Sequence, residues 1–232
     1  MNLDELRNDV CRANRLLAET GLVTLTWGNV SGISADRSLV VIKPSGVPYE
    51  ALSPEQMVVV DLEGNRVEGD LRPSSDTPSH VLLYRHFEGI GGITHTHSRC
   101  ATIFAQARLE IPCLGTTHAD HFFGPVPVTR PLSPREVEEA YEANTGQVIV
   151  ERFAGLHPLE RPAVLVAGHA PFTWGPDAAA SVNNAVALEA VAEMALGTLT
   201  IRGDAPPLEP YVLNKHYRRK HGADAYYGQT PY

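Results

Sequence analysis

The sequence predicts an α/β fold in which helices cover both faces of a mixed, mainly antiparallel sheet, giving three α/β/α layers. Helical and strand-like segments alternate along the chain, and several neighbouring strands are joined by short turns rather than helical crossovers. Hydrophobic residues make up 43% of the 232 residues, enough for a sizeable core. No linker rich in proline, glycine or serine divides the chain, so we expect a single domain over residues 1–232.

Periodic patterns and turn signals define the elements of the first half. Leu6, Val10, Ala13 and Leu17 recur on one helical face, and Gly21 can end that helix. Runs of aliphatic and β-branched residues indicate strands, and a Glu-Gly-Asn turn joins two of them as a hairpin. The expected elements are a helix at 3–20, strands at 22–26, 39–42, 57–62 and 66–68, and a helix at 78–87.

The second half follows the same logic with longer helices. Short apolar runs predict buried strands, and the Pro206-Pro207 pair ends a long helix rich in alanine and valine before a basic tail. The expected elements are strands at 90–94 and 163–168 and helices at 98–107, 133–153, 177–199 and 214–220.

Charge and cysteine content exclude several classes of protein. The net charge of -8 argues against general binding to nucleic acid or to an anionic membrane. Cys11, Cys100 and Cys113 are widely spaced and predict reduced thiols rather than a disulfide framework. The acidic N-terminus does not resemble a signal peptide, and no apolar run approaches the roughly 20 residues of a membrane span. We therefore expect a cytoplasmic protein.

Two histidines separated by one residue are the most informative feature of the chain. His95 and His97 follow a buried strand, and side chains on a strand alternate faces, so both imidazoles point to one side. His169 ends another apolar strand. Three histidines and an acid describe a zinc-type catalytic site that can keep a position open for substrate. Strand histidines with ordinary hydrogen bonds are the alternative.

Three polar loops have the composition of a phosphate site. Residues 28–32 supply glycines whose amides can approach an anion, residues 43–46 add a lysine and a serine, and residues 73–76 place two serines before a helix. Each loop is alternatively an ordinary turn, because glycine, proline, serine and asparagine are turn residues. None matches a P-loop or a dinucleotide fingerprint.

Candidate acid/base groups lie apart from these loops. Asp120 and the tail residue Tyr227 can each exchange a proton, and His216 lies in the basic tail helix. A tail of this kind is otherwise a solvated or interface segment.

Seven stretches of the chain occur in the order found in one known family. This chain resembles the metal-dependent class II aldolase, epimerase and adducin-head family, and within it the L-ribulose-5-phosphate 4-epimerases. It departs from the family pattern at Ala170, where glycine is usual, and in a short segment at 155–161. The matching stretches are 22–31, 42–47, 72–78, 94–99, 115–120, 171–175 and 215–229.

The resemblance assigns roles to individual residues. It implies Zn²⁺ or another divalent metal held by Asp76, His95, His97 and His169. It also implies that Asp120 and Tyr227 act as acid/base groups, with His216 assisting Asp120, in a homotetramer whose sites lie between subunits. The implied phosphate-binding residues are Gly28, Asn29, Lys43, Ser45, Gly46, Ser74 and Ser75.

The implied reaction is 4-epimerisation of L-ribulose 5-phosphate to D-xylulose 5-phosphate in pentose or L-arabinose catabolism. The C4 hydrogen is not α to the carbonyl, so the expected route is retro-aldol cleavage followed by re-addition. A sugar-phosphate aldolase of the same family is the nearest alternative, and such members usually carry Glu where this chain has Asp76. A non-catalytic adducin-head-like module would lack the metal histidines, and a plain sugar-phosphate binding protein would not need Asp120 and Tyr227.

Overall fold

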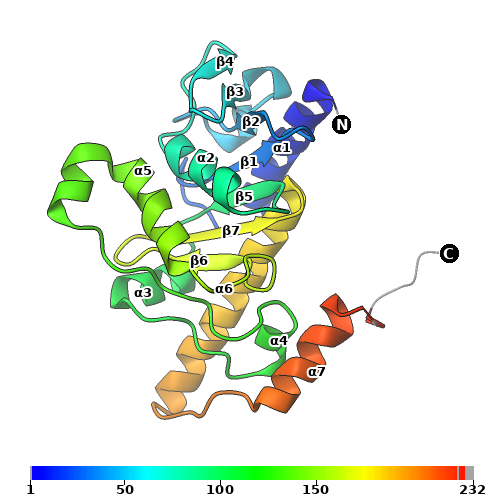
Figure 1. Cartoon of the computed structure of the whole chain (residues 1–232), viewed down its shortest axis with the longest axis vertical. Helices are drawn as coiled ribbons and strands as arrows, with labels where there is room; N and C mark the ends of the chain where they lie inside the picture. The colour runs from blue at the N-terminus through cyan, green and yellow to red at the C-terminus, as the bar shows by residue number, and fades with distance from the viewer. Residues whose placement is uncertain (1, 224, 228–232) are drawn as a thin grey trace.

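One antiparallel sheet organises the described part of the chain, residues 2–223 and 225–227 of a computed structural model (Figure 1). Its order is β4-β3-β2-β1-β5-β7-β6, and each neighbouring pair of strands runs antiparallel. The strands are β1 (Asn29–Ile33), β2 (Leu39–Ile42), β3 (Val58–Asp61), β4 (Arg66–Glu68), β5 (Gly92–His95), β6 (Ala163–Leu165) and β7 (Pro171–Gly175).

Helices cover both faces of the sheet, as the sequence predicts. One core cluster joins α2 and α5 to one face, and two others join α1, α3 and α6 to the opposite face. Figure 1 shows α4 and α7 together at the end of the molecule away from β4. The helices are α1 (Leu3–Glu19), α2 (Thr77–His86), α3 (Arg99–Ala107), α4 (Thr116–Ala119), α5 (Pro134–Arg152), α6 (Ala178–Ile201) and α7 (Pro210–His221).

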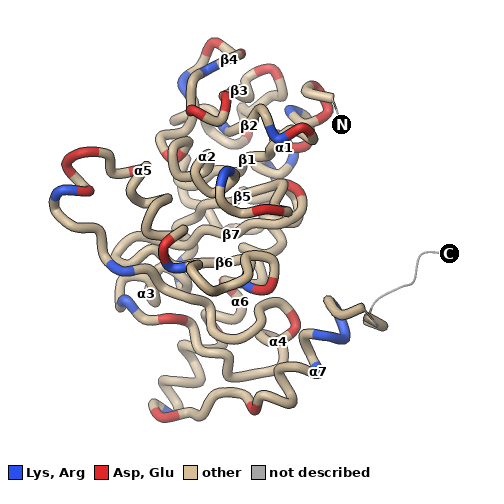
Figure 2. Tube along the Cα trace, viewed as in Figure 1, with Lys and Arg blue, Asp and Glu red and all other residues tan. Residues whose placement is uncertain are grey.

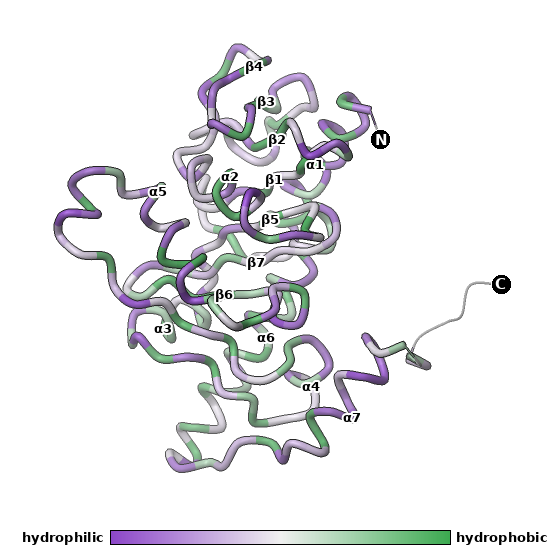
Figure 3. Tube along the Cα trace, viewed as in Figure 1, coloured by the Kyte–Doolittle hydropathy of each residue, from purple (hydrophilic) through white to green (hydrophobic). Residues whose placement is uncertain are grey.

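Helix α6 is apolar over much of its length (Figure 3). By length and composition alone it could cross a membrane, although no run in the sequence was expected to be long and apolar enough. In this fold its buried residues, among them Val182 and Leu188, pack against the sheet and its neighbouring helices. The carboxylate of Glu189 accepts the backbone N–H groups of Cys100 and Ala101 at the start of α3. These contacts are those of a helix that covers a protein core.

The expected strand at 22–26 is wrong. Leu25 has a left-handed backbone, with φ of 54°, and the segment turns instead of extending. The strand begins later, as β1, within residues predicted to be a loop because of their glycine, serine and asparagine content. Gly32 belongs in this strand because a Cβ there would lie 2.9 Å from the side chains of Leu6 and Val10. The close approach of α1 therefore explains why β1 contains a glycine that is otherwise typical of a turn.

Candidate metal and phosphate site

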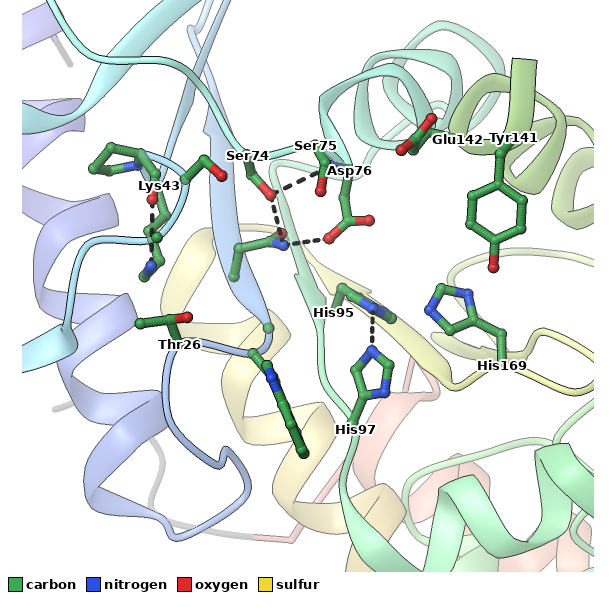
Figure 4. Close-up of a pocket in the computed structure, with 16 residues that line it drawn as sticks. Thr26, Lys43, Ser74, Ser75, Asp76, His95, His97, Tyr141, Glu142 and His169 are labelled. Atoms are coloured by element: carbon green, nitrogen blue, oxygen red, sulfur yellow. Dashed lines mark hydrogen bonds between the residues drawn. The ribbon is translucent and has the colours of Figure 1, made fainter. Parts of the chain in front are cut away.

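A cleft of about 550 Å³ opens where β1 begins and β2 and β5 end, near the start of α2 (Figure 4). Its walls come from segments far apart in the sequence, including the middle of α5. The cleft contains each residue predicted for the metal and for the phosphate: Gly28, Asn29, Lys43, Ser45, Gly46, Ser74, Ser75, Asp76, His95, His97 and His169.

Three histidines converge on one point of the cleft. One ring nitrogen from each of His95, His97 and His169 lies within 4.8 Å of the others. His95 stacks on Phe172 at 4.2 Å between ring centroids, and its Nδ1 donates to the carbonyl of Pro171 at 2.9 Å. The proton is therefore on Nδ1, and the Nε2 lone pair of His95 faces His97 Nε2 at 3.2 Å.

The protonation of the cluster suits a cation. Removal from water lowers the pKa of His97 and of His169 to about 4, and the neighbouring imidazole of His95 contributes to lowering both. The two rings are therefore neutral at neutral pH, with lone pairs free to coordinate. The Nδ1 atom of His169 is buried and has no hydrogen-bond partner within residues 2–223 and 225–227. Two neutral imidazoles, an unused buried nitrogen and the adjoining ring of His95 fit a divalent metal such as Zn²⁺.

Asp76 adds negative charge beside this cluster without belonging to it. Its oxygens are not among the ligand atoms that lie within 4.8 Å of one another. Burial raises the pKa of Asp76, but the nearby His95 and His80 and a hydrogen bond from Asn29 outweigh burial and hold the pKa below its ordinary value. Asn29 Nδ2 donates to Asp76 Oδ2 at 2.7 Å and also to Ser74 Oγ at 3.0 Å. Asn29 therefore links the carboxylate to the predicted phosphate loop.

The two loops beyond Asp76 are tied to each other through their backbones. Ser74 N donates to the carbonyl of Lys43 at 3.0 Å, and Ser45 N donates to the carbonyl of Arg72 at 2.9 Å. This pairing holds hydroxyl groups and a cation along one wall of the cleft (Figure 4). The arrangement suits an oxyanion such as a phosphate group.

Lys43 is a buried cation, only 2% exposed. Its ammonium donates to the carbonyls of Val47 at 2.8 Å and Pro44 at 3.3 Å and lies 4.9 Å from the centroid of the Tyr49 ring. Burial lowers the pKa of Lys43 to about 8. A buried ammonium held by neutral groups retains its charge for an incoming anion.

Residue 28 must be a glycine because its backbone lies directly against the end of β5, the strand that carries His95. Its φ is +88°, and a Cβ there would lie 2.7 Å from the carbonyl oxygen of His95. An alanine would both strain the backbone and press on the strand that carries His95.

Tyr141, Glu142 and Trp27 also line the cleft, and none of them was predicted from the sequence as a site residue. Tyr141 and Glu142 follow Ala140, whose non-helical backbone (φ -164°, ψ 72°) kinks α5. Figure 4 shows the Tyr141 hydroxyl directed toward His169, and the two ring centroids are 6.0 Å apart. Trp27 could have been found, because an aromatic residue directly precedes the first glycine loop.

The three predicted acid/base residues lie outside the cleft of their own chain. Asp120 follows α4, where its carboxylate accepts from Arg219 Nη2 at 2.7 Å and lies 3.1 Å from His216 Nδ1. Burial raises the pKa of Asp120, but these α7 partners outweigh burial and lower it. Tyr227 is 59% exposed, and the cations of Arg219 and Lys220 lie over its ring.

This second group forms a compact basic and acidic cluster on α4 and α7. Lys and Arg residues gather in the last turn of α7 (Figure 2). The structure therefore brings Asp120 and His216 together and places Tyr227 beside Arg219, which also binds Asp120, but Asp120, His216 and Tyr227 do not line the cleft that holds the histidine cluster of the same chain.

Comparisons with known proteins agree with this architecture. The profile of the family described as "Class II Aldolase and Adducin N-terminal domain" matches residues 8–196. An L-fuculose 1-phosphate aldolase has the same fold, with 24% identity, a TM-score of 0.78 and coverage of 93% of this chain and 95% of that chain.

Two further solved structures are similar. YgbL from Klebsiella pneumoniae, a candidate aldolase/epimerase/decarboxylase, has 25% identity and a TM-score of 0.72 over 93% of this chain and 99% of that chain. An L-fuculose-1-phosphate aldolase from Thermus thermophilus has 25% identity and a TM-score of 0.66 over 88% of this chain and 98% of that chain. The same architecture therefore occurs in L-fuculose-1-phosphate aldolases and in YgbL, whose description names three possible activities.

Proposed function

Because this chain belongs to the family of class II aldolase and adducin N-terminal domains, we propose that it is a divalent-metal-dependent enzyme that interconverts L-ribulose 5-phosphate and D-xylulose 5-phosphate. One observation carries the proposal: a single cleft joins a three-histidine cluster to loops with a buried lysine, and Asp76 is the carboxylate that Asn29 ties to those loops. The cleft therefore offers places for a metal, a phosphate and a short sugar between them.

His95, His97 and His169 would hold the metal, with Asp76 beside them, and we propose Zn²⁺ as its identity. When bound, a divalent cation supplies Lewis-acid stabilisation of the negative charge that develops as the C3–C4 bond breaks. Lys43 and the serine hydroxyls of the adjoining loops would bind the phosphate and fix the sugar in the cleft.

Epimerisation needs two proton carriers, one on each side of the sugar. One group removes the C4 hydroxyl proton, the C3–C4 bond breaks, and the released aldehyde turns before the bond forms again on its other face. The second group returns a proton to the new C4 oxygen. We assign these roles to Asp120 and Tyr227, with His216 orienting Asp120 through their 3.1 Å contact.

A neighbouring subunit would bring these groups to the cleft. Within one chain, Asp120 and Tyr227 are not among the cleft residues. A homotetramer with sites between subunits would place α4 and α7 of one subunit at the cleft of the next. We place such an enzyme in the cytoplasm, in pentose catabolism.

The first test measures the reaction and the metal together. The purified zinc-loaded protein is expected to convert L-ribulose 5-phosphate into D-xylulose 5-phosphate. His97→Asn removes one imidazole from the cluster, so bound zinc and activity should fall together. Full metal content with wild-type turnover in this variant would contradict the metal-site assignment.

The second test addresses the shared site. Tyr227→Phe removes one exposed hydroxyl and should lower turnover by about 10²- to 10⁴-fold. Mixing this variant with His97→Asn, under conditions that exchange subunits, should restore activity, because about one site in four then combines two intact halves. Mixtures no more active than the separate variants would show that sites are not shared in this way.

An aldolase is the second candidate, because two similar structures are L-fuculose-1-phosphate aldolases. Both reactions begin with cleavage of a C3–C4 bond and differ in whether the aldehyde is released. Accumulation of glycolaldehyde phosphate and dihydroxyacetone from L-ribulose 5-phosphate, without D-xylulose 5-phosphate, would favour the aldolase.

A further inference from the structure

A column of polar side chains runs from the cleft into the interior between α2 and β1. Asp76, His80 and Tyr84 follow one another at intervals of one helical turn, so they face the same side. Asn29 and Ser31 share the opposing face of β1, because strand side chains alternate. Asn29 contacts Asp76, while Ser31 Oγ lies 2.7 Å from His80 Nδ1 and 2.9 Å from the Tyr84 hydroxyl.

The tautomer of His80 follows from these contacts when Tyr84 is taken as the donor to Ser31. The backbone N–H of Ile93 acts on the Tyr84 oxygen, and burial raises the pKa of Tyr84, so its phenol proton is retained, and we assign that proton to the contact with Ser31. Ser31 accepts that proton and donates its own to His80 Nδ1. Burial lowers the pKa of His80 to about 3, so the ring is neutral. A neutral imidazole that accepts at Nδ1 carries its proton on Nε2.

The Nε2–H group of His80 lacks an acceptor. His80 is 0% exposed, and its Nε2 has no hydrogen-bond partner among the residues that the structure describes. A buried donor without a partner costs about 1–3 kcal/mol, so folded proteins rarely keep one without a reason.

The surroundings of this donor lead to the metal cleft. Asp76 and His95 both act electrostatically on His80. The His80 ring meets the edge of Phe172 at 5.8 Å between centroids, and His95 stacks on the same phenyl ring. A charged carboxylate is a stronger acceptor than the amide oxygen of Asn29, the other unpaired polar atom of the column.

We propose that His80 is a positioning residue of the metal site, whose Nε2–H donates to the Asp76 carboxylate when the cation is bound. Asn29 holds one carboxylate oxygen from β1, and His80 holds the group from the next turn of α2. Ser31 sets the tautomer that makes this donor available. The inference rests on the metal site of the proposed function but not on the identity of the sugar.

Two substitutions at His80 separate the donor from the rest of the side chain. His80→Asn places an amide near Nδ1, where it can still meet Ser31, but removes the donor at Nε2. His80→Gln places an amide nitrogen near the position of Nε2 and keeps the donor. In chelator competition with the full-length protein, His80→Asn should weaken zinc binding by about tenfold or more, and His80→Gln by no more than about threefold.

A matched pair of hydroxyl deletions tests the tautomer. Ser31→Ala and Tyr84→Phe each remove one buried hydroxyl from the column. Ser31→Ala releases the His80 proton to either nitrogen and should weaken zinc binding, whereas Tyr84→Phe leaves Ser31 able to donate and should change it little. The wild-type His80 Nε2–H proton, assigned by its loss in His80→Asn, should also shift in the NMR spectrum when zinc is added.

The outcomes separate this inference from the proposed function. Equal zinc affinity in His80→Asn and His80→Gln overturns the positioning role of His80. A loss of zinc affinity in Tyr84→Phe equal to that in Ser31→Ala also overturns it. If His80→Asn fails to fold, as urea unfolding of the metal-free protein would show, the hydroxyl pair decides the question. A wild-type chain that binds no divalent metal contradicts the proposed function and this inference with it. Normal metal binding without epimerase activity contradicts only the proposed function.

Discussion

At the scale of single residues, the cleft combines groups whose charges are controlled by burial. Burial keeps the ring of His169 neutral, whereas the neighbouring histidines and Asn29 keep Asp76 ionised. Lys43 is the critical case, because its pKa of about 8 lies close to physiological pH. A phosphate held by Lys43 depends on that proton.

Lys43 should therefore give the reaction an alkaline limit. Burial disfavours the charged form, so the ammonium persists below about pH 8 and is lost above it. We expect kcat/KM for the sugar phosphate to fall by about tenfold per pH unit above that value, since kcat/KM reports the free enzyme. Lys43→Arg keeps a cation at high pH and should remove this decline, although we expect the variant to bind the sugar phosphate less tightly. The same alkaline decline in Lys43→Arg would assign it to another group.

At the scale of elements, the site depends on how closely helices approach strands. The start of α6 lies against β5, the strand that carries His95. A Cβ on Gly92 would lie 2.3 Å from the backbone carbonyl of Asp177. Only glycine permits this contact, which fixes β5 against α6.

Gly92→Ala should consequently destabilise the protein, by about 1–3 kcal/mol or more, because the backbone cannot yield as a side chain can. Gly197 provides a matched control within α6, since a methyl group added there would meet no atom within 4 Å. Gly197→Ala should stabilise the protein by about 0.5–1 kcal/mol through helix propensity. Urea unfolding measures both free energies. Equal stability of Gly92→Ala and wild type would show that the contact can open without cost.

At the scale of the whole molecule, buried neutral histidines make the folded state sensitive to acid. Burial lowers the pKa of His80 to about 3 and that of His118 to about 4. His118 Nε2 also donates to the carbonyl of Gly124 at 2.8 Å, so the neutral ring has a structural role near α4.

Acidification should weaken folding before the carboxylates titrate. The folded pKa of each histidine lies below its unfolded value of 6.5, so the unfolded chain binds protons first as the pH falls. The contribution of the two histidines to the free energy of unfolding is complete above about pH 6.5. Below that pH it decreases by about 1.4 kcal/mol per pH unit for each histidine. Urea unfolding in chelator at about pH 7 and about pH 5 tests this loss. His118→Gln keeps a donor for Gly124 and should reduce the slope; an unchanged slope would exclude His118 as a contributor.

The sequence by itself predicted the α/β layering, most helices, and a set of residues that the structure brings together in one cleft. The layering and the helices follow from hydrophobic period and turn chemistry, and the histidine pair follows from its spacing, which are properties of neighbouring residues. The roles of Asp76 and of the phosphate-binding residues came from the family resemblance. Only the tertiary structure decided that β1 is a strand, that the kink at Ala140 places Tyr141 in the cleft, and that Asp120 and Tyr227 lie away from it in their own chain. The physical reason is that each of these depends on contacts between distant segments: α1 against Gly32, α5 against His169, and α4 against α7.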